Sequence, residues 1–238
     1  MRRLLTPALL AATVLGLSAC ATGDATFSGP DEETGEVTGG QAEELPALDC
    51  AEPPAAPSSP LSFTQDDLPE PMSGDPATVT ATVETTCGDI ELELLADKAP
   101  QTVASFAFLA EEGYWDGSAC HRLTTQGIFV LQCGDPTGTG RGNPGYGFGI
   151  ENAPEDGAYP PGTLAMARAQ DPESNGGQFF IVYEDTTLPV QGGGYTVFGE
   201  VTSGLDIVQA LAAEGVQGGG GDGAPTQPIS ILSVTVDD

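Results

Sequence analysis

Apolar and polar residues alternate in two neighbouring runs that begin near residue 79. Val79, Ala81 and Val83 alternate with Thr and Glu, and the alternation resumes at residues 90–94 after the segment 85–88. Successive side chains of a strand point to opposite faces of a sheet. The pattern therefore predicts an antiparallel β-hairpin with one buried face.

The spacing of apolar residues then changes to the three or four of an amphipathic helix. Such a run follows Pro100, a residue favoured at the first helical position, and ends at Gly113. A second run lies between Ser203 and Gly215. We expect two helices, the second with Ser203 as its N-cap.

Five other apolar segments have the length of strands. They are residues 128–132, 163–167, 179–183, 196–201 and 229–236. Two helices and about eight short strands predict a mostly β fold, with helices over the open ends of a closed sheet. A β-sandwich is the alternative that this pattern leaves open.

The first 20 residues differ from the rest of the chain. Arg2 and Arg3 precede a largely apolar run that is too short to span a bilayer, and small residues follow it. Leu17-Ser18-Ala19-Cys20 resembles a bacterial lipobox, the site where a lipoprotein signal peptide is cut and the cysteine is lipidated. We expect a signal peptide over 1–19 and a lipid on Cys20, which places the protein at the cell membrane, facing outside the cytoplasm. An ordinary signal peptide with a chance cysteine is the alternative.

Residues 20–75 contain no basic residue, many prolines and few large apolar residues. A segment of this composition buries too little apolar surface to offset the entropy of ordering it. We expect an acidic, disordered tether over 20–75 and one folded domain over 76–238.

The charge of the chain excludes several classes of function. Its 238 residues include 35 acidic and 6 basic ones, and the net charge is −29. Nucleic-acid binding needs clustered Lys and Arg, so we expect none. The one histidine, His121, excludes the histidine clusters of most catalytic zinc sites, and we predict no metal site, although carboxylate-bound calcium stays open.

Two short motifs are weak indications of chemistry. Residues 140–145 match G-x-G-x-x-G, but no helix follows, and Pro144 removes a backbone donor that a dinucleotide would use. His121 lies beside Cys120 without an identifiable orienting Asp, so we interpret it as a packed side chain rather than a catalytic base.

Five motifs in order are far more specific. They read CHR at 120–122, FVLQCGD at 129–135, MARA at 166–169, SNGGQFFI at 174–181 and VFGEV at 197–201. Together they resemble the cyclophilin family of peptidyl-prolyl cis-trans isomerases, over residues 77–236. The resemblance implies an all-β fold with two helices, namely a closed eight-stranded antiparallel barrel capped by two α-helices.

The resemblance also implies the residues of the site. The catalytic residues would be Arg122, Gln132 and Phe129. The substrate-binding residues would be Val130, Ala167, Arg168, Ala169, Gln178, Phe180, Leu188 and Tyr195. Rotation about an X-Pro bond breaks no covalent bond, so no cofactor is required.

The implied function is isomerisation of X-Pro bonds that assists the folding of exported proteins. The partners would be proline-containing unfolded or extended polypeptides, and the membrane through the lipid anchor; we expect a monomer. A non-catalytic cyclophilin-like module that binds peptides at the cell envelope is the alternative.

Four cysteines are left when Cys20 is set aside for lipid, and they allow three disulfide connectivities. Export to an oxidising compartment makes disulfides admissible. In the barrel that the resemblance implies, Cys120 and Cys133 lie on consecutive strands, and Cys87 lies in the first hairpin turn within reach of Cys50. We therefore favour Cys120 with Cys133 and Cys50 with Cys87, while free buried thiols remain the alternative.

Overall fold

The structure is a computed structural model that describes residues 45–74 and 76–237. The alternating segment near its start forms the hairpin predicted from the sequence. Strands β1 (Val79–Thr85) and β2 (Gly88–Leu94) pair antiparallel, with Val79 opposite Leu94 and Thr85 opposite Gly88. Their inward-facing apolar side chains are buried in the core.

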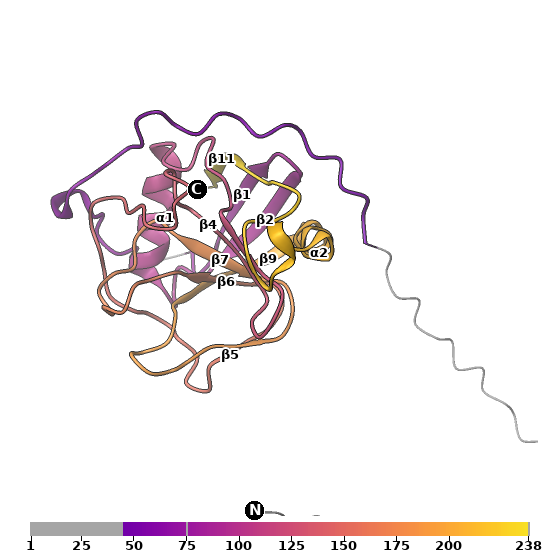
Figure 1. Cartoon of the computed structure of the whole chain (residues 1–238). Coiled ribbons are helices and arrows are strands. Elements are labelled where there is room, and N and C mark those ends of the chain that lie inside the picture. The colour runs from indigo at the N-terminus through magenta and orange to yellow at the C-terminus, as the bar shows by residue number, and fades with distance from the viewer. Residues whose placement is uncertain (1–44, 75, 238) are drawn as a thin grey trace, which may run out of the picture. The chain divides into compact units, whose positions relative to one another are not determined.

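Nine strands of the described chain form one antiparallel sheet (Figure 1). Its order is β10-β3-β4-β7-β6-β9-β2-β1-β11. The strands after the hairpin are β3 (Arg122–Thr124), β4 (Val130–Cys133), β6 (Thr163–Met166), β7 (Phe179–Val182), β9 (Val197–Ser203), β10 (Asp222–Gly223) and β11 (Ile231–Val236). A separate pair consists of β5 (Ala158–Tyr159) and β8 (Thr186–Thr187). Two short 3-10 helices cover Gln65–Asp67 and Gln217–Gly219.

The prediction of a closed eight-stranded barrel is wrong, because the sheet is an open, curled one of nine strands. The outer edge of β3 is occupied by β10, which pairs Asp222 with Thr124. Only the segment before β3 reaches the other end of the sheet, through an isolated bridge between Ala119 and Ser230. Hydrogen bonds such as the 3.0 Å bond from Cys120 N to Ile229 O hold the two ends together without a continuous ladder.

Helix α1 (Pro100–Glu111) begins at the predicted proline. Its N-cap, Ala99, offers no side-chain acceptor. The carboxylate of Glu151, distant in sequence, instead accepts hydrogen bonds from the backbone N–H groups of Gln101 (3.0 Å) and Thr102 (2.8 Å). A carboxylate in this position satisfies free N–H groups and complements the helix dipole.

Helix α2 (Leu205–Glu214) begins one residue later than predicted. Ser203 is the last residue of β9 and does not cap the helix; the N-cap is Gly204, with φ of 85°. A Cβ at residue 204 would overlap the carbonyl oxygen of Asp89. The turn from strand to helix therefore requires a glycine at this position, which the Ser-based prediction did not consider.

Aromatic rings fill the main core between α1 and the sheet. The ring centroid of Phe106 lies 4.7 Å from that of Trp115 and 5.5 Å from that of Phe198. Trp115 in turn contacts Phe179 edge-on at 5.7 Å and donates a 2.9 Å hydrogen bond to Gly177 O. Edge-to-face contacts of this kind add to the free energy gained from burial.

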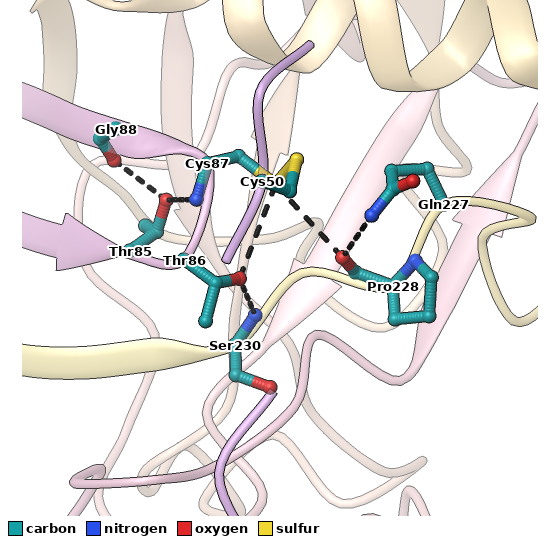
Figure 2. The surroundings of a disulfide bond; sticks show 8 residues. All are labelled: Cys50, Thr85, Thr86, Cys87, Gly88, Gln227, Pro228 and Ser230. Atoms are coloured by element: carbon teal, nitrogen blue, oxygen red, sulfur yellow. Dashed lines mark hydrogen bonds between the residues drawn. A yellow bond between two sulfur atoms is a disulfide. The ribbon is translucent and has the colours of Figure 1, made fainter. Parts of the chain in front are cut away.

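Residues 45–74, which belong to the segment expected to be a disordered tether, contact the domain at several points. Cys50 forms a disulfide with Cys87 in the hairpin turn (Figure 2). Beside it, Ala51 N donates a 2.7 Å hydrogen bond to Thr86 O. Farther along, the ring of Phe63 packs edge-on against Phe108 at 5.0 Å. A covalent bond and one large ring anchor a segment whose overall composition resembles that of a tether.

The other sequence-based expectations for the N-terminal part fall outside the described residues. These are the signal peptide at 1–19, the lipidated Cys20 and residues 20–44 of the tether. Within the described part of the chain, no helix is long and apolar enough to cross a membrane.

The second disulfide joins Cys120 and Cys133. Cys120 lies just before β3 and Cys133 ends β4, next to the pair formed by Arg122 and Gln132. Both disulfides have the connectivity favoured from the sequence and the resemblance.

Candidate active site

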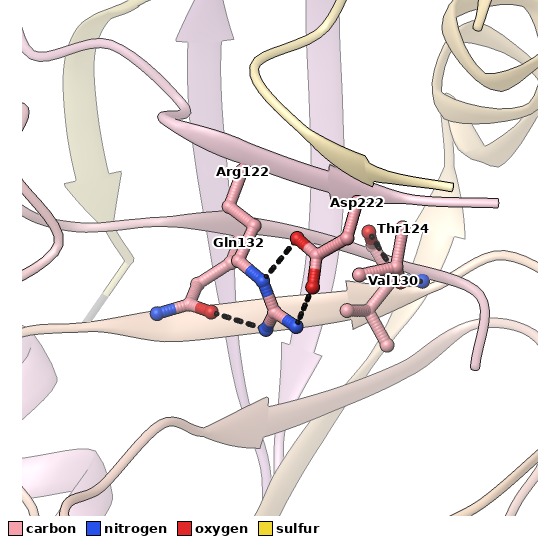
Figure 3. A network of polar contacts seen from close by, with 5 residues as sticks. All are labelled: Arg122, Thr124, Val130, Gln132 and Asp222. Carbon is pink, nitrogen blue, oxygen red and sulfur yellow. Dashed lines mark hydrogen bonds and ion pairs between the residues drawn. The ribbon is translucent and has the colours of Figure 1, made fainter. Parts of the chain in front are cut away.

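The antiparallel register of β3 and β4 places Arg122 directly opposite Gln132. Arg122 Nη1 donates a 3.2 Å hydrogen bond to Gln132 Oε1 (Figure 3). Gln132 Nε2 donates to Gln178 Oε1 at 2.9 Å, and Gln178 Nε2 donates to Gly142 O at 2.8 Å. Each side chain in this chain of hydrogen bonds is fixed by the next.

Asp222 holds the other side of the Arg122 guanidinium. Arg122 Nε donates to Asp222 Oδ1 at 2.8 Å and Nη2 donates to Oδ2 at 2.7 Å, so the pair is bidentate (Figure 3). These bonds raise the pKa of Arg122 and lower the pKa of Asp222, so both groups are ionised at neutral pH. Three of the five N–H bonds of the guanidinium are engaged in this way, and two are left for a ligand.

A small cavity of about 120 Å³ with an apolar wall lies beside Arg122. Its lining residues are Arg122, Ile128, Val130, Gln132, Ala167, Arg168, Phe180, Leu188 and Tyr195. Val130, Phe180 and Leu188 belong to a buried cluster that is separate from the main core. The sheet therefore supplies a rigid apolar wall to a cavity that carries one paired guanidinium.

A larger cavity of about 370 Å³ adjoins the first one. Gln132, Ala167 and Arg168 line both cavities. The other residues of the larger cavity are Gly140, Arg141, Gly142, Asn143, Ala169, Ser174, Gly176, Gly177 and Gln178. The two cavities together form the groove.

Asp135 fixes the loop that forms one wall of the larger cavity. It is completely buried, and burial acts to raise its pKa. Hydrogen bonds from Thr137 and from the backbone N–H of Gly142 outweigh that effect and lower the pKa to about 2. A Cβ at residue 142 would overlap this carboxylate, so the loop can close on Asp135 only with a glycine there.

Arg168 lines both cavities, and it lies against Tyr195, which lines the smaller one. The Arg168 guanidinium lies 5.0 Å from the centroid of the Tyr195 ring. It donates to Gly194 O at 2.8 Å through Nε and to Gly192 O at 2.9 Å through Nη2. A cation held over an aromatic ring in this way is fixed in position, although its contacts are to uncharged groups.

The structure brings together ten of the eleven candidate residues of the groove. Phe129 is the exception: its ring packs edge-on against Tyr183 at 6.0 Å and does not line either groove cavity. On a strand, residues two apart share a face, so Val130 and Gln132 share theirs with Ile128. Ile128 lines the smaller cavity in its place. The alternation along this segment was the signal that could have identified Ile128.

The groove offers no set of groups for making or breaking covalent bonds. None of its lining residues is an Asp, Glu, His, Cys or Lys. Among the described residues, no cluster of His, Cys, Asp or Glu could hold a metal ion. What the groove presents is shape, apolar surface and fixed hydrogen-bond donors.

Comparisons with known proteins agree with this arrangement. The family model described as cyclophilin type peptidyl-prolyl cis-trans isomerase/CLD matches residues 80–236. Probable peptidyl-prolyl cis-trans isomerase B of Mycobacterium tuberculosis (strain H37Rv) is 47% identical over 176 residues, which are 68% of this chain and 56% of that relative. Peptidyl-prolyl cis-trans isomerase A of the same strain is 41% identical over 177 residues, which are 67% of this chain and 93% of that relative. The chain thus spans little more than half of the first of these relatives.

Solved structures are similar as well. The crystal structure of a cyclophilin-type isomerase of Cryptosporidium parvum matches with a TM-score of 0.58 and 30% identity, covering 68% of this chain and 98% of that one. The same protein, crystallised in the presence of the dipeptide Ala-Pro, matches with a TM-score of 0.57.

Proposed function

The chain belongs to the family of cyclophilin-type peptidyl-prolyl cis-trans isomerases, and we propose that its groove catalyses rotation about X-Pro peptide bonds. One observation carries this proposal: a guanidinium fixed on two sides, by Asp222 and Gln132, lines a small cavity whose wall is formed by Val130, Phe180 and Leu188. The Ala-Pro dipeptide used with the Cryptosporidium relative supports a proline-containing ligand for this chain too.

In the proposed binding mode the pyrrolidine ring of proline occupies the smaller cavity. Val130, Phe180 and Leu188 contact the ring, because these side chains form the buried apolar wall. The residue before proline then lies against Gln132 and the backbone of Arg168, which line both cavities.

Arg122 acts on the bond as it twists. An X-Pro bond rotates slowly because amide resonance must be lost, at a barrier of ~18–20 kcal/mol. When resonance is lost, the proline nitrogen becomes pyramidal and gains a lone pair that can accept a hydrogen bond. A donor that meets this lone pair interacts more strongly with the twisted state than with the planar one, and therefore lowers the barrier.

Fixing the guanidinium beforehand increases this effect. A free Arg side chain loses roughly 2 kcal/mol of rotamer entropy when it is immobilised. Here Asp222 and Gln132 immobilise it before a ligand arrives. The donor is therefore already in place when the twisted state forms.

A direct assay separates catalysis from binding alone. We expect the purified protein to accelerate cis-to-trans conversion of a neutral Ala-Ala-Pro-Phe anilide, followed through cleavage of the trans form by chymotrypsin. Nuclear magnetic resonance exchange spectroscopy of the same peptide without protease is the control. Binding of the peptide without acceleration would contradict the proposal and support the non-catalytic peptide-binding module.

We also propose that the protein is exported and anchored to the membrane through a lipid on Cys20. The lipobox-like sequence at residues 17–20 and the two disulfides support this location. Radioactive palmitate should label the protein in cells and should not label Cys20→Ala. Labelling of both forms, or of neither, would contradict the anchor at Cys20.

A further inference from the structure

Basic residues are scarce in this chain, and they gather at the groove. The whole chain has 6 basic and 35 acidic residues, and the four basic residues that the structure describes are Lys98, Arg122, Arg141 and Arg168. Three of the four line the groove, and no Asp or Glu lines it. The groove is therefore a local cationic site on a strongly acidic protein.

Two of these three cations have no carboxylate partner in an ion pair among the described residues. Asp222 neutralises Arg122 through the bidentate pair. Among the described residues, no carboxylate oxygen lies within 4.0 Å of the guanidinium nitrogens of Arg141 or Arg168. Asp135 lies behind the same wall and is ionised, so it offsets part of the positive charge of the groove, but it is buried and its oxygens accept hydrogen bonds from the loop backbone, including Arg141 N.

Arg168 is also fixed in place, although no carboxylate pairs with it in the described part of the chain. Carbonyl oxygens of Gly192, Gly194 and Ala169 accept three of its five N–H bonds. Carbonyl groups orient the guanidinium without cancelling its charge. Two N–H bonds remain for an anionic group in the groove.

Resting on the function proposed above, we infer that the groove selects proline segments that carry Asp or Glu upstream of the proline. With proline in the smaller cavity, the preceding residue lies at Gln132 and Arg168. An extended chain advances about 3.3 Å per residue, so the next residue upstream enters the larger cavity that these two residues also line. A carboxylate there meets Arg141 and Arg168.

The overall charge of the protein favours the opposite selectivity. A net charge of −29 attracts cationic peptides and repels anionic ones. At physiological ionic strength, however, exposed charges are screened beyond about 8 Å. Charges that line the groove therefore outweigh the carboxylates elsewhere on the surface for a side chain bound inside it. Of the two carboxylates beside the groove, Asp222 is paired with Arg122 and Asp135 is buried behind the wall.

Three blocked pentapeptides test this inference. They carry Glu, Gln or Lys two positions before the proline and are otherwise identical and neutral. For each peptide, exchange spectroscopy at 0.15 M salt measures kcat/KM, and a chemical-shift titration measures the dissociation constant. We expect kcat/KM to decrease in the order Glu, Gln, Lys, with about a three- to tenfold difference between Glu and Lys, the size of one exposed ion pair gained against one repulsion.

Two variants with the same change of charge assign the effect to the groove. Arg141→Gln should reduce the ratio of kcat/KM for the Glu peptide to kcat/KM for the Lys peptide to about half or less of its original value. Lys98→Gln is the matched control, because Lys98 is the one described basic residue outside the groove, where it pairs with Asp97 at 3.5 Å. It should leave the ratio unchanged.

The outcomes separate the two proposals. Equal rates for the three peptides, or a preference for Lys, would overturn the inference and leave the isomerase activity standing. Tighter binding of the Glu peptide without any acceleration would overturn the isomerase activity and support the selectivity. An equal decrease, in Arg141→Gln and Lys98→Gln, of the ratio of kcat/KM for the Glu peptide to that for the Lys peptide would also overturn the inference. It would show that net charge alone sets the preference.

Discussion

Asp222 is expected to position Arg122 for catalysis, and Asp222→Asn tests this. The carboxylate accepts two of the three hydrogen bonds that hold the guanidinium. An amide at this position keeps the size of the side chain, loses the charge and can accept from only one of its two terminal atoms. Arg122 would then be held by Gln132 and one weaker bond.

The size of the effect follows from the ordering of the arginine. If between one third and two thirds of a rotamer entropy of ~2 kcal/mol is no longer supplied by Asp222, roughly 0.7–1.3 kcal/mol must be supplied in the transition state. This corresponds to about a three- to tenfold fall in kcat/KM. The effect should appear in kcat more than in KM, because Arg122 contributes mainly to the twisted state.

Global stability should change little in the same variant. The side chains of Arg122 and Asp222 are 36% and 57% exposed. Ion pairs with this exposure contribute about 0–1 kcal/mol to the free energy of unfolding. Asp237→Asn removes the same charge from an exposed carboxylate that follows β11 and does not line the groove, and it should leave kcat/KM unchanged.

The assay is isomerisation of the neutral tetrapeptide, with urea unfolding measured on the same samples. Asp222→Glu should restore part of the lost kcat, because it returns a carboxylate. A kcat/KM for Asp222→Asn within twofold of the original, or a fall matched by an equal loss in Asp237→Asn, would refute the positioning role.

Two further predictions concern stability. The disulfide between Cys50 and Cys87 closes a loop with a sequence separation of 37. Loop-closure entropy predicts that the free energy of unfolding of the double Ser variant, measured in urea, is lower by roughly 3–4 kcal/mol. A decrease below about 1 kcal/mol would contradict the anchoring of residues 45–74. Because the pKa of Asp135 is lowered to about 2 in the folded state, below an unfolded value of about 3.9, its contribution is complete above about pH 5 and is lost as the pH falls towards 2. Asp135→Asn should therefore be less stable than the original protein at pH 7, and the difference should narrow between pH 4 and 2; a constant difference would show that its hydrogen bonds do not depend on the charge.

The helices and strands with a regular spacing of apolar residues were predictable from the sequence. Periodicity identified the hairpin at 79–94 and both helices, since burial of one face imposes a spacing of two or of three to four. Strand β10 was missed, because it lies in the glycine-rich segment 217–223, which has no apolar period. The short strands β3, β5 and β8 were missed as well, and the closed barrel was taken from the family resemblance.

In the candidate site, too, some residues could be predicted from the sequence and others could not. Motifs located Arg122 and Gln132, and the strand register brings them together as expected. The role of Asp222 could not be predicted, because its 100-residue separation from Arg122 is bridged only by the pairing of β10 with β3. The contacts of Phe63 were hidden for a similar reason: a single ring in a polar, proline-rich segment gives no period.

The central claim is that the Arg122 guanidinium stabilises the twisted X-Pro bond, and the kinetics of Arg122→Lys and Arg122→Ala test it most directly. Lysine keeps the charge but cannot make the paired contacts with Asp222 and Gln132, so both variants should lose activity. For Arg122→Ala we expect kcat/KM on the neutral tetrapeptide to fall by about 10²–10³-fold, the value of one transition-state donor, while the peptide still binds in the apolar cavity. Activity of Arg122→Ala within fivefold of the original protein would contradict the account.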